Sequence, residues 1–150
     1  MQEHPDGPDR QHRRPDGVDD KTVEALGALS KALETTERAR GRLYDFHQMT
    51  GTADFQLERA ADLLEEAGHP EWAEKIRAEI VGRNVIPGYW TFQIIEGYNA
   101  TYYRPFQELE ESCLRELAQG RHHLHEAELK EERRTPGRPG HAAGPPLPEE

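Results

Sequence analysis

The chain has 150 residues, of which 34% are hydrophobic and 32% are charged, and its formal net charge is −10. The hydrophobic share is lower than is usual for a globular chain, so only part of the sequence is expected to form a packed core. The acidic balance argues against a nucleic-acid partner, because phosphate binding depends on clustered Lys and Arg.

Both ends of the chain lack the apolar residues that a core needs. Residues 1–18 contain no aliphatic residue before Val18, and residues 135–150 are rich in proline and glycine. Such segments bury too little apolar surface to offset the entropy of ordering them. We therefore predict disordered tails at 1–18 and 135–150, a helical bundle domain at 19–120, and a charged, His-containing helix extension at 121–134.

The cellular setting is predicted from three features. No apolar run approaches the length of about 18 residues that a membrane span requires. The first residues include Pro and Asp, where a signal peptide would have its apolar segment. Cys113 is the only cysteine, which excludes an internal disulfide. We expect a cytoplasmic protein that has no membrane partner.

A long amphipathic helix is predicted after the first tail. Asp19 and Asp20 offer an N-cap, and apolar residues then recur at steps of three and four. Gly51 is expected to end this helix as its C-terminal cap. Gly27 and Gly41 each cost a helix about 1 kcal/mol relative to Ala, which suggests that another helix comes close to them. A helix of about 30 residues is long for a domain of this size, so we expect an elongated fold or pairing with a second chain.

Two short helices are expected next, over residues 52–67 and 70–81. Gly68 separates them, and Pro70 suits the first helical position, where its missing N–H is harmless. Gly82 is expected to close the second of them.

The densest apolar and aromatic content lies at residues 82–96. Residues 89–95 are rich in β-formers and are compatible with a strand or a helix. A helix is favoured because Pro87 cannot take the positive φ that a tight hairpin requires at its first loop position. A helical stripe also runs on from Trp90, with a kink expected at Pro105.

The sequence as a whole predicts an all-α fold. We expect an elongated bundle of about four helices, two long and two short, with disordered N- and C-terminal tails. The aromatic segment 82–96 is predicted to sit at the centre of this bundle, with the other helices packed onto it.

A ferritin-like metal site has little support in the sequence. Such a bundle needs Glu-x-x-His pairs on two helices. Glu66 and His69 form the only such pair, and Gly68 breaks the helix between them.

A second group of metal-ligating residue types lies near the C-terminal tail. It consists of His122, His123, His125 and Glu126, of which His122 and Glu126 would share a helix face. Without cysteine partners, this group predicts opportunistic binding of Ni or Zn in vitro rather than a physiological metal site.

No catalytic residue and no cofactor are predicted. Cys113 falls on the apolar stripe, where a free cysteine behaves as a small hydrophobe. Ser30 and Ser112 lie in ordinary helical settings, with no nucleophile elbow around them.

A polar set near the aromatic segment is the candidate ligand- or partner-binding site. It consists of His47, Gln48, Arg83, Asn84, Trp90, Gln93 and Glu96. If the first helix and the one that follows residue 90 run parallel, these groups converge; in an antiparallel register His47 need not reach Trp90. The other interpretation is that Arg83, Asn84 and Gln93 cap helix ends and bond loop carbonyls.

The segments Leu43-Tyr44-Asp45-Phe46-His47-Gln48, Gly82-Arg83-Asn84-Val85-Ile86-Pro87-Gly88 and Trp90-Thr91-Phe92-Gln93 resemble those of a family of small, uncharacterised bacterial helical proteins. The resemblance covers residues 25–110 and leaves out both tails. It implies an ordered central region and carries no activity.

Two functions from different classes follow. The first is a non-enzymatic helical interaction or structural module that self-associates or binds another protein. The alternative is a small-ligand-binding or weakly enzymatic bundle with a polar pocket near His47, Trp90 and Glu96. A ferritin-like metal-binding bundle is a distant third. The identity of a partner or ligand does not follow from the sequence.

Overall fold

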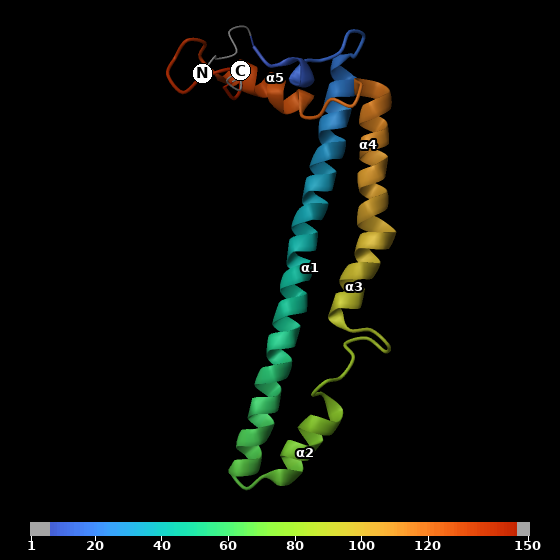
Figure 1. Cartoon of the computed structure of the whole chain (residues 1–150), viewed down its shortest axis with the longest axis vertical. Helices are drawn as coiled ribbons and strands as arrows, with labels where there is room; N and C mark the ends of the chain where they lie inside the picture. Colours follow the sequence, from blue (N-terminus) through green and yellow to red (C-terminus); the bar gives the residue numbers. More distant parts are fainter. Residues whose placement is uncertain (1–6, 147–150) are drawn as a thin grey trace. The chain divides into compact units, whose positions relative to one another are not determined.

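A computed structural model describes residues 7–146, and over this range the chain is all-α, as predicted (Figure 1). The elements are the 3₁₀ turn η1 (Arg10–His12), α1 (Asp20–Glu66), α2 (Pro70–Glu79), α3 (Thr91–Tyr98), the π-helical turn η2 (Asn99–Tyr103), α4 (Arg104–Ala118) and α5 (Leu124–Arg133). Among these residues the sole β-type pairing is one isolated bridge between Ile86 and Tyr89.

Helix α1 is longer than the sequence predicts. Its N-cap is Asp19, whose carboxylate accepts a hydrogen bond from the backbone N–H of Thr22 at 2.7 Å. The helix continues through Gly51, so the predicted C-terminal cap there is wrong, and residues 52–67 do not form a separate helix. Thr52 does not cap a new helix, because its hydroxyl donates to the carbonyl of Gln48 one turn back at 3.0 Å.

The turn between α1 and α2 forms where glycine and proline predict it. Gly68 has a φ of +89°, in the left-handed region that glycine adopts without strain. Pro70 is the first residue of α2, as predicted. Helix α1 ends at Glu66 and His69 is the N-cap of α2, so the Glu66–His69 pair does not share a helix.

The segment after α2 makes a tight turn and then a helix. The N–H of Tyr89 donates to the carbonyl of Ile86 at 2.8 Å, and Gly88 has a φ of +80°. Pro87 at the first central position and glycine at the second suit a type II turn. The turn does not open into a hairpin, and residues 91–98 form α3, so the helical interpretation of this ambiguous segment is confirmed.

The predicted stripe runs through Trp90, Ile94 and Tyr98, and the structure displaces it by one residue. In the structure the residues that meet α1 in this region are Thr91, Asn99 and Tyr103, and Ile95 is buried beside them. These positions recur every four residues, which drifts by about 40° per step around an α-helix. The π-helical turn η2 takes more residues per turn and corrects this drift just before Pro105.

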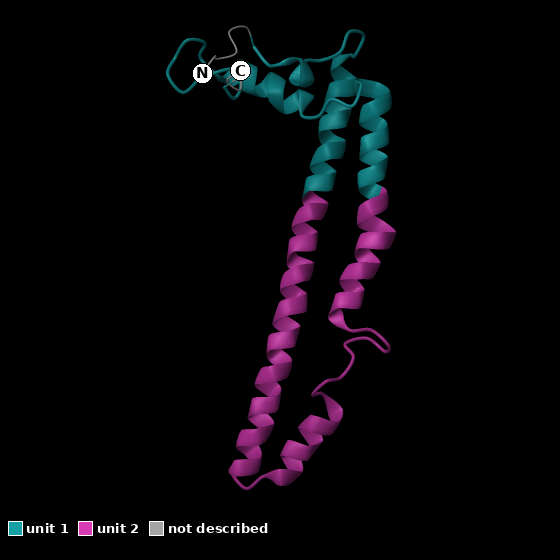
Figure 2. Cartoon of the chain, in the orientation of Figure 1, with its two compact units in different colours: residues 1–34, 106–150 teal, residues 35–105 magenta. Residues whose placement is uncertain are grey.

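The chain divides into two compact units, coloured separately in Figure 2. Unit 1 comprises residues 1–34 and 106–150, and unit 2 comprises residues 35–105. Helix α1 contributes to both. The aliphatic core of unit 1 consists of Val23, Leu26, Leu114, Ala118 and Leu124, with Cys113 packed against it.

The prediction that segment 82–96 forms the centre of the fold is wrong. Trp90 is 58% exposed, and Ile86, Tyr89 and Phe92 are also exposed. In the described part of unit 2 few residues are buried, and Ile95 is the only large apolar one among them: Thr36, Ala61, Ala73 and Ile95. Two layers of helix have only one shared face, which is too narrow to cover every large side chain.

Helix α5 lies within the segment 121–134 and is set apart from α4 by residues 119–123. It is held by Leu124 in the core of unit 1 and by Glu128, which receives two hydrogen bonds from Arg14 at 2.9 and 3.0 Å. Arg14 also bonds Asp20 at 2.7 Å. Disorder of the tails 1–18 and 135–150 stays a prediction, and residues 1–6 and 147–150 lie outside the described part.

Candidate functional site

The candidate site lies in unit 2, where α1 faces α2, α3 and the loop between them. The loop is fastened to α1 by Asp54, whose carboxylate accepts the backbone N–H of Gly82 at 2.8 Å. At the start of α3, Nδ1 of His47 lies 2.6 Å from the hydroxyl oxygen of Thr91. These two bonds fix both ends of the loop against a single helix.

A second set of contacts holds α2 to the same stretch of α1. The guanidinium of Arg77 donates to Asp62 at 2.7 Å and pairs with Glu65 at 2.9 Å. The hydrogen bond to Asp62, followed by that to Glu65, raises the pKa of Arg77 above its ordinary value. One cation on α2 thus joins two carboxylates one turn apart on α1.

Further along, α1 meets η2 through a polar cluster. The guanidinium of Arg40 lies 3.6 Å over the ring of Tyr103 and donates to the side chain of Asn99 at 3.0 Å. The hydroxyl of Tyr103 donates to Glu37, and this bond raises the pKa of Tyr103 above its ordinary value. Since residue numbers fall along α1 as they rise along α3 and η2, the two segments are antiparallel.

Between these fastened points lies a groove of about 700 Å³. Its lining comprises Thr50, Gly51, Ala53, Asp54, Phe55, Leu57, Ile80, Gly82, Arg83, Asn84, Val85, Trp90 and Thr91. The apolar side chains dominate, and Phe55 is 75% exposed. A groove of this size and character suits an apolar side-chain ridge or an apolar ligand.

The structure brings together part of the predicted polar set. Arg83, Asn84 and Trp90 line the groove, and His47 adjoins it through Thr91. The helices are antiparallel, the register in which His47 need not reach Trp90, and His47 nevertheless contacts Thr91 at the start of α3.

The other predicted site residues have different positions. Gln93 caps α3, because its side-chain oxygen accepts the backbone N–H of Trp90 at 2.8 Å. Arg83 also has a capping contact, with the carbonyl of Glu79 at 3.3 Å. Gln48 and Glu96 are exposed and do not line the groove. Capping therefore accounts for Gln93, and Arg83 serves both roles.

Sequence reasoning missed the apolar half of the groove. Phe55, Leu57 and Ile80 line the groove and are absent from the predicted site, which was drawn from polar residues and Trp90. One signal was available: Phe55 lies off the apolar stripe of its helix, where a large aromatic side chain gains nothing from the protein's own core.

The His cluster at the C-terminal end is rearranged from the prediction. Helix α5 begins at Leu124, so His122 lies outside it and does not share a helix face with Glu126. Nδ1 of His122 instead lies 3.9 Å from the carboxylate of Glu110. His123 lies 3.9 Å from Glu126.

Comparison with known proteins adds no assignment: no protein-family model, curated protein or solved structure matches the chain. The resemblance carried by residues 43–48 and 82–93 stays a prediction. Across residues 7–146, no helix combines the length and the apolar character needed to cross a membrane.

Proposed function

We propose that this chain is a non-enzymatic helical interaction module that self-associates through the groove of unit 2. The observation that carries the proposal is the exposure of large apolar side chains around that groove, from Phe55 at 75% to Val85 at 42%. Contiguous apolar surface of this kind on a small unit marks a contact surface.

The occupant we propose is a second copy of the chain. On α1, Phe46 and Met49 are exposed and lie three residues apart on one face of the helix, so one chain supplies both a groove and an apolar helical ridge. In a two-fold pair the same patch serves both copies, with each ridge in the other's groove. The groove also carries both charge signs, on Asp54 and Arg83, which supports contact between copies despite the net charge of −10.

Summed over all its faces, unit 2 exposes more large apolar surface than one standard interface takes from each partner. The large apolar side chains of unit 2 that are more than 40% exposed are Tyr44, Phe46, Met49, Phe55, Leu63, Trp72, Ile80, Val85, Ile86, Tyr89, Trp90, Phe92 and Tyr102. Together they expose on the order of 1,000 Å², at about 100 Å² each. A standard interface takes about 800 Å² from each partner.

Phe55→Arg tests the proposal. Phe55 leaves about 150 Å² in water, whose burial is worth at most about 4 kcal/mol per copy, so a charge there should weaken association on the order of 100-fold. Leu129→Arg, an exposed leucine on α5 in unit 1, is the matched control and should leave association unchanged. Light scattering over a concentration series measures both.

The outcomes separate the candidate functions. A wild-type chain that stays monomeric throughout the series would contradict self-association and leave the groove as a ligand pocket, the alternative predicted from the sequence. Equal loss in both variants would place the contact outside the groove. We also propose that the protein acts in the cytoplasm.

A further inference from the structure

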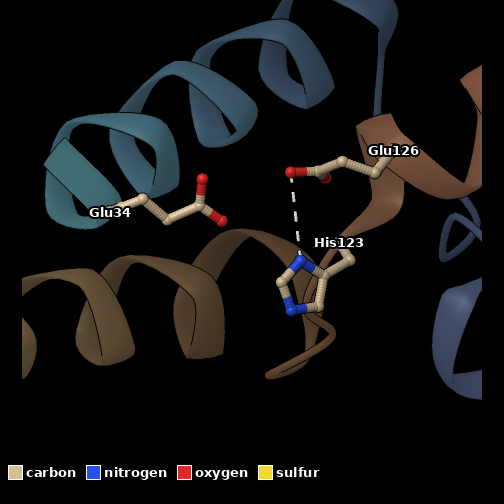
Figure 3. A group of neighbouring side chains, drawn as sticks. All are labelled: Glu34, His123 and Glu126. Atoms are coloured by element: carbon tan, nitrogen blue, oxygen red, sulfur yellow. Dashed lines mark ion pairs between the residues drawn. The ribbon is translucent and has the colours of Figure 1, made fainter. Parts of the chain in front are cut away.

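Unit 1 holds a second feature, independent of the groove, where two helices bring metal-ligating side chains together. Glu34 extends from α1, His123 precedes α5 as its N-cap, and Glu126 lies in the first turn of α5. One donor atom from each lies within 4.8 Å of the other two. Figure 3 shows the three side chains pointing toward a common space.

The carboxylates of Glu34 and Glu126 repel each other, and a bound cation would relieve this repulsion. Carboxylate oxygens of Glu34 and Glu126 are brought within 4.8 Å, where two like charges repel each other. Within residues 7–146, neither carboxylate pairs with a Lys or Arg, and the contact of Glu126 is with His123 at 3.9 Å. A divalent cation between them would neutralise both charges at once.

The donor set selects the class of ion. One imidazole nitrogen and two carboxylate oxygens suit a borderline first-row ion such as Zn²⁺ better than Mg²⁺ or Ca²⁺, which prefer oxygen ligands alone. Donors bound to Zn²⁺ at about 2.0–2.1 Å lie about 3.3 Å apart in a tetrahedron. All three side chains are exposed, so side-chain rotation can close the remaining distance.

The backbone placement of the three donors is built into the packing of α5 on α1. A Cβ at Gly27 would lie 3.0 Å from the Cβ of His125, so glycine is what permits this close approach. Glu34 lies two turns further along α1 on the same face as Gly27. Arg14 also holds α5, through two hydrogen bonds to Glu128. The site therefore has fixed backbone positions and movable side chains.

We propose that Glu34, His123 and Glu126 form a three-ligand site for a divalent transition-metal ion, with water completing the coordination. The experiment is calorimetric titration of the untagged, full-length protein with Zn²⁺, alongside the visible spectrum of the Co²⁺ form. Wild type should bind one ion at this site. Glu34→Gln and His123→Asn should each weaken binding by at least ~10-fold, since each removes one of three ligands.

Asn is chosen at position 123 because His123 has a φ of +60°, a conformation that asparagine tolerates. His122→Asn and Glu132→Gln are the matched controls, because His122 faces Glu110 and Glu132 lies outside the cluster. Both should bind within ~2-fold of wild type. Gly27→Ala keeps every donor and should weaken binding several-fold by pushing α5 outward.

Ligand variants that bind as tightly as wild type would overturn the proposal and assign any binding to other histidines. Controls that weaken binding as much as the ligand variants would overturn it as well. Unchanged affinity in Gly27→Ala would refute the positioning role of the α1–α5 contact. Circular dichroism of each variant confirms that α5 and the fold are retained.

Discussion

Gly51→Ala tests whether α1 is a single helix of 47 residues. The sequence predicts that Gly51 is the C-terminal cap of a helix. A cap residue has a left-handed backbone conformation, in which alanine would be strained. In the structure Gly51 is an interior helical residue, and a Cβ placed on it meets nothing within 4 Å. Alanine should therefore stabilise the fold by about 1 kcal/mol, its advantage over glycine within a helix.

For a chain of this length, that gain corresponds to a rise in Tm of about 2–4 °C. Urea denaturation followed by circular dichroism at low protein concentration measures the free energy of unfolding. Gly41→Ala, also open and interior to α1, should give the same gain. Gly68→Ala should destabilise by about 1–2 kcal/mol, because its φ is +89°. Destabilisation by Gly51→Ala would refute the continuous helix.

Three further predictions concern single contacts. Leu114→Ala should cost about 2–3 kcal/mol of unfolding free energy, because the leucine is 3% exposed in the small core of unit 1; a loss below 1 kcal/mol would contradict that core. The bond from Thr22 lowers the pKa of Asp19, so its contribution is present at neutral pH and is lost as pH falls through that lowered value; Asp19→Asn should flatten the acid side of the stability–pH curve. The bond to Glu37 raises the pKa of Tyr103, so its contribution to the free energy of unfolding is present below pH 10 and is lost as pH rises through the raised value. Tyr103→Phe should remove this loss of stability at alkaline pH. An unchanged stability–pH curve would argue against the bond.

The sequence predicts the helical class because its signals there are local. Asp19 as an N-cap, Gly68 as a stop and Pro70 as a start all act within a few residues, and the structure confirms each. The predicted helix end at Gly51 is wrong because glycine is only mildly unfavourable inside a helix. The hydroxyl of Thr52 also bonds to the carbonyl of Gln48 within α1.

What the sequence does not reveal depends on long-range packing. The inward face of α3 and η2 is displaced by a π-helical turn, which no simple period predicts. Glu34 joins His123 and Glu126 only because α5 packs on α1. Composition favours a core position for the aromatic segment, yet Trp90 is exposed, since the described part of unit 2 has no third layer to cover it.

Hydrogen exchange at increasing protein concentration tests the central claim most directly, because it reports both association and its location. The loop at residues 82–90 is exposed, and Phe55 faces the same groove. If a second copy occupies that groove, amide exchange across this loop should slow as concentration rises, and the Phe55→Arg variant should not show the change. Exchange in residues 82–90 that is the same at every concentration would contradict self-association through the groove.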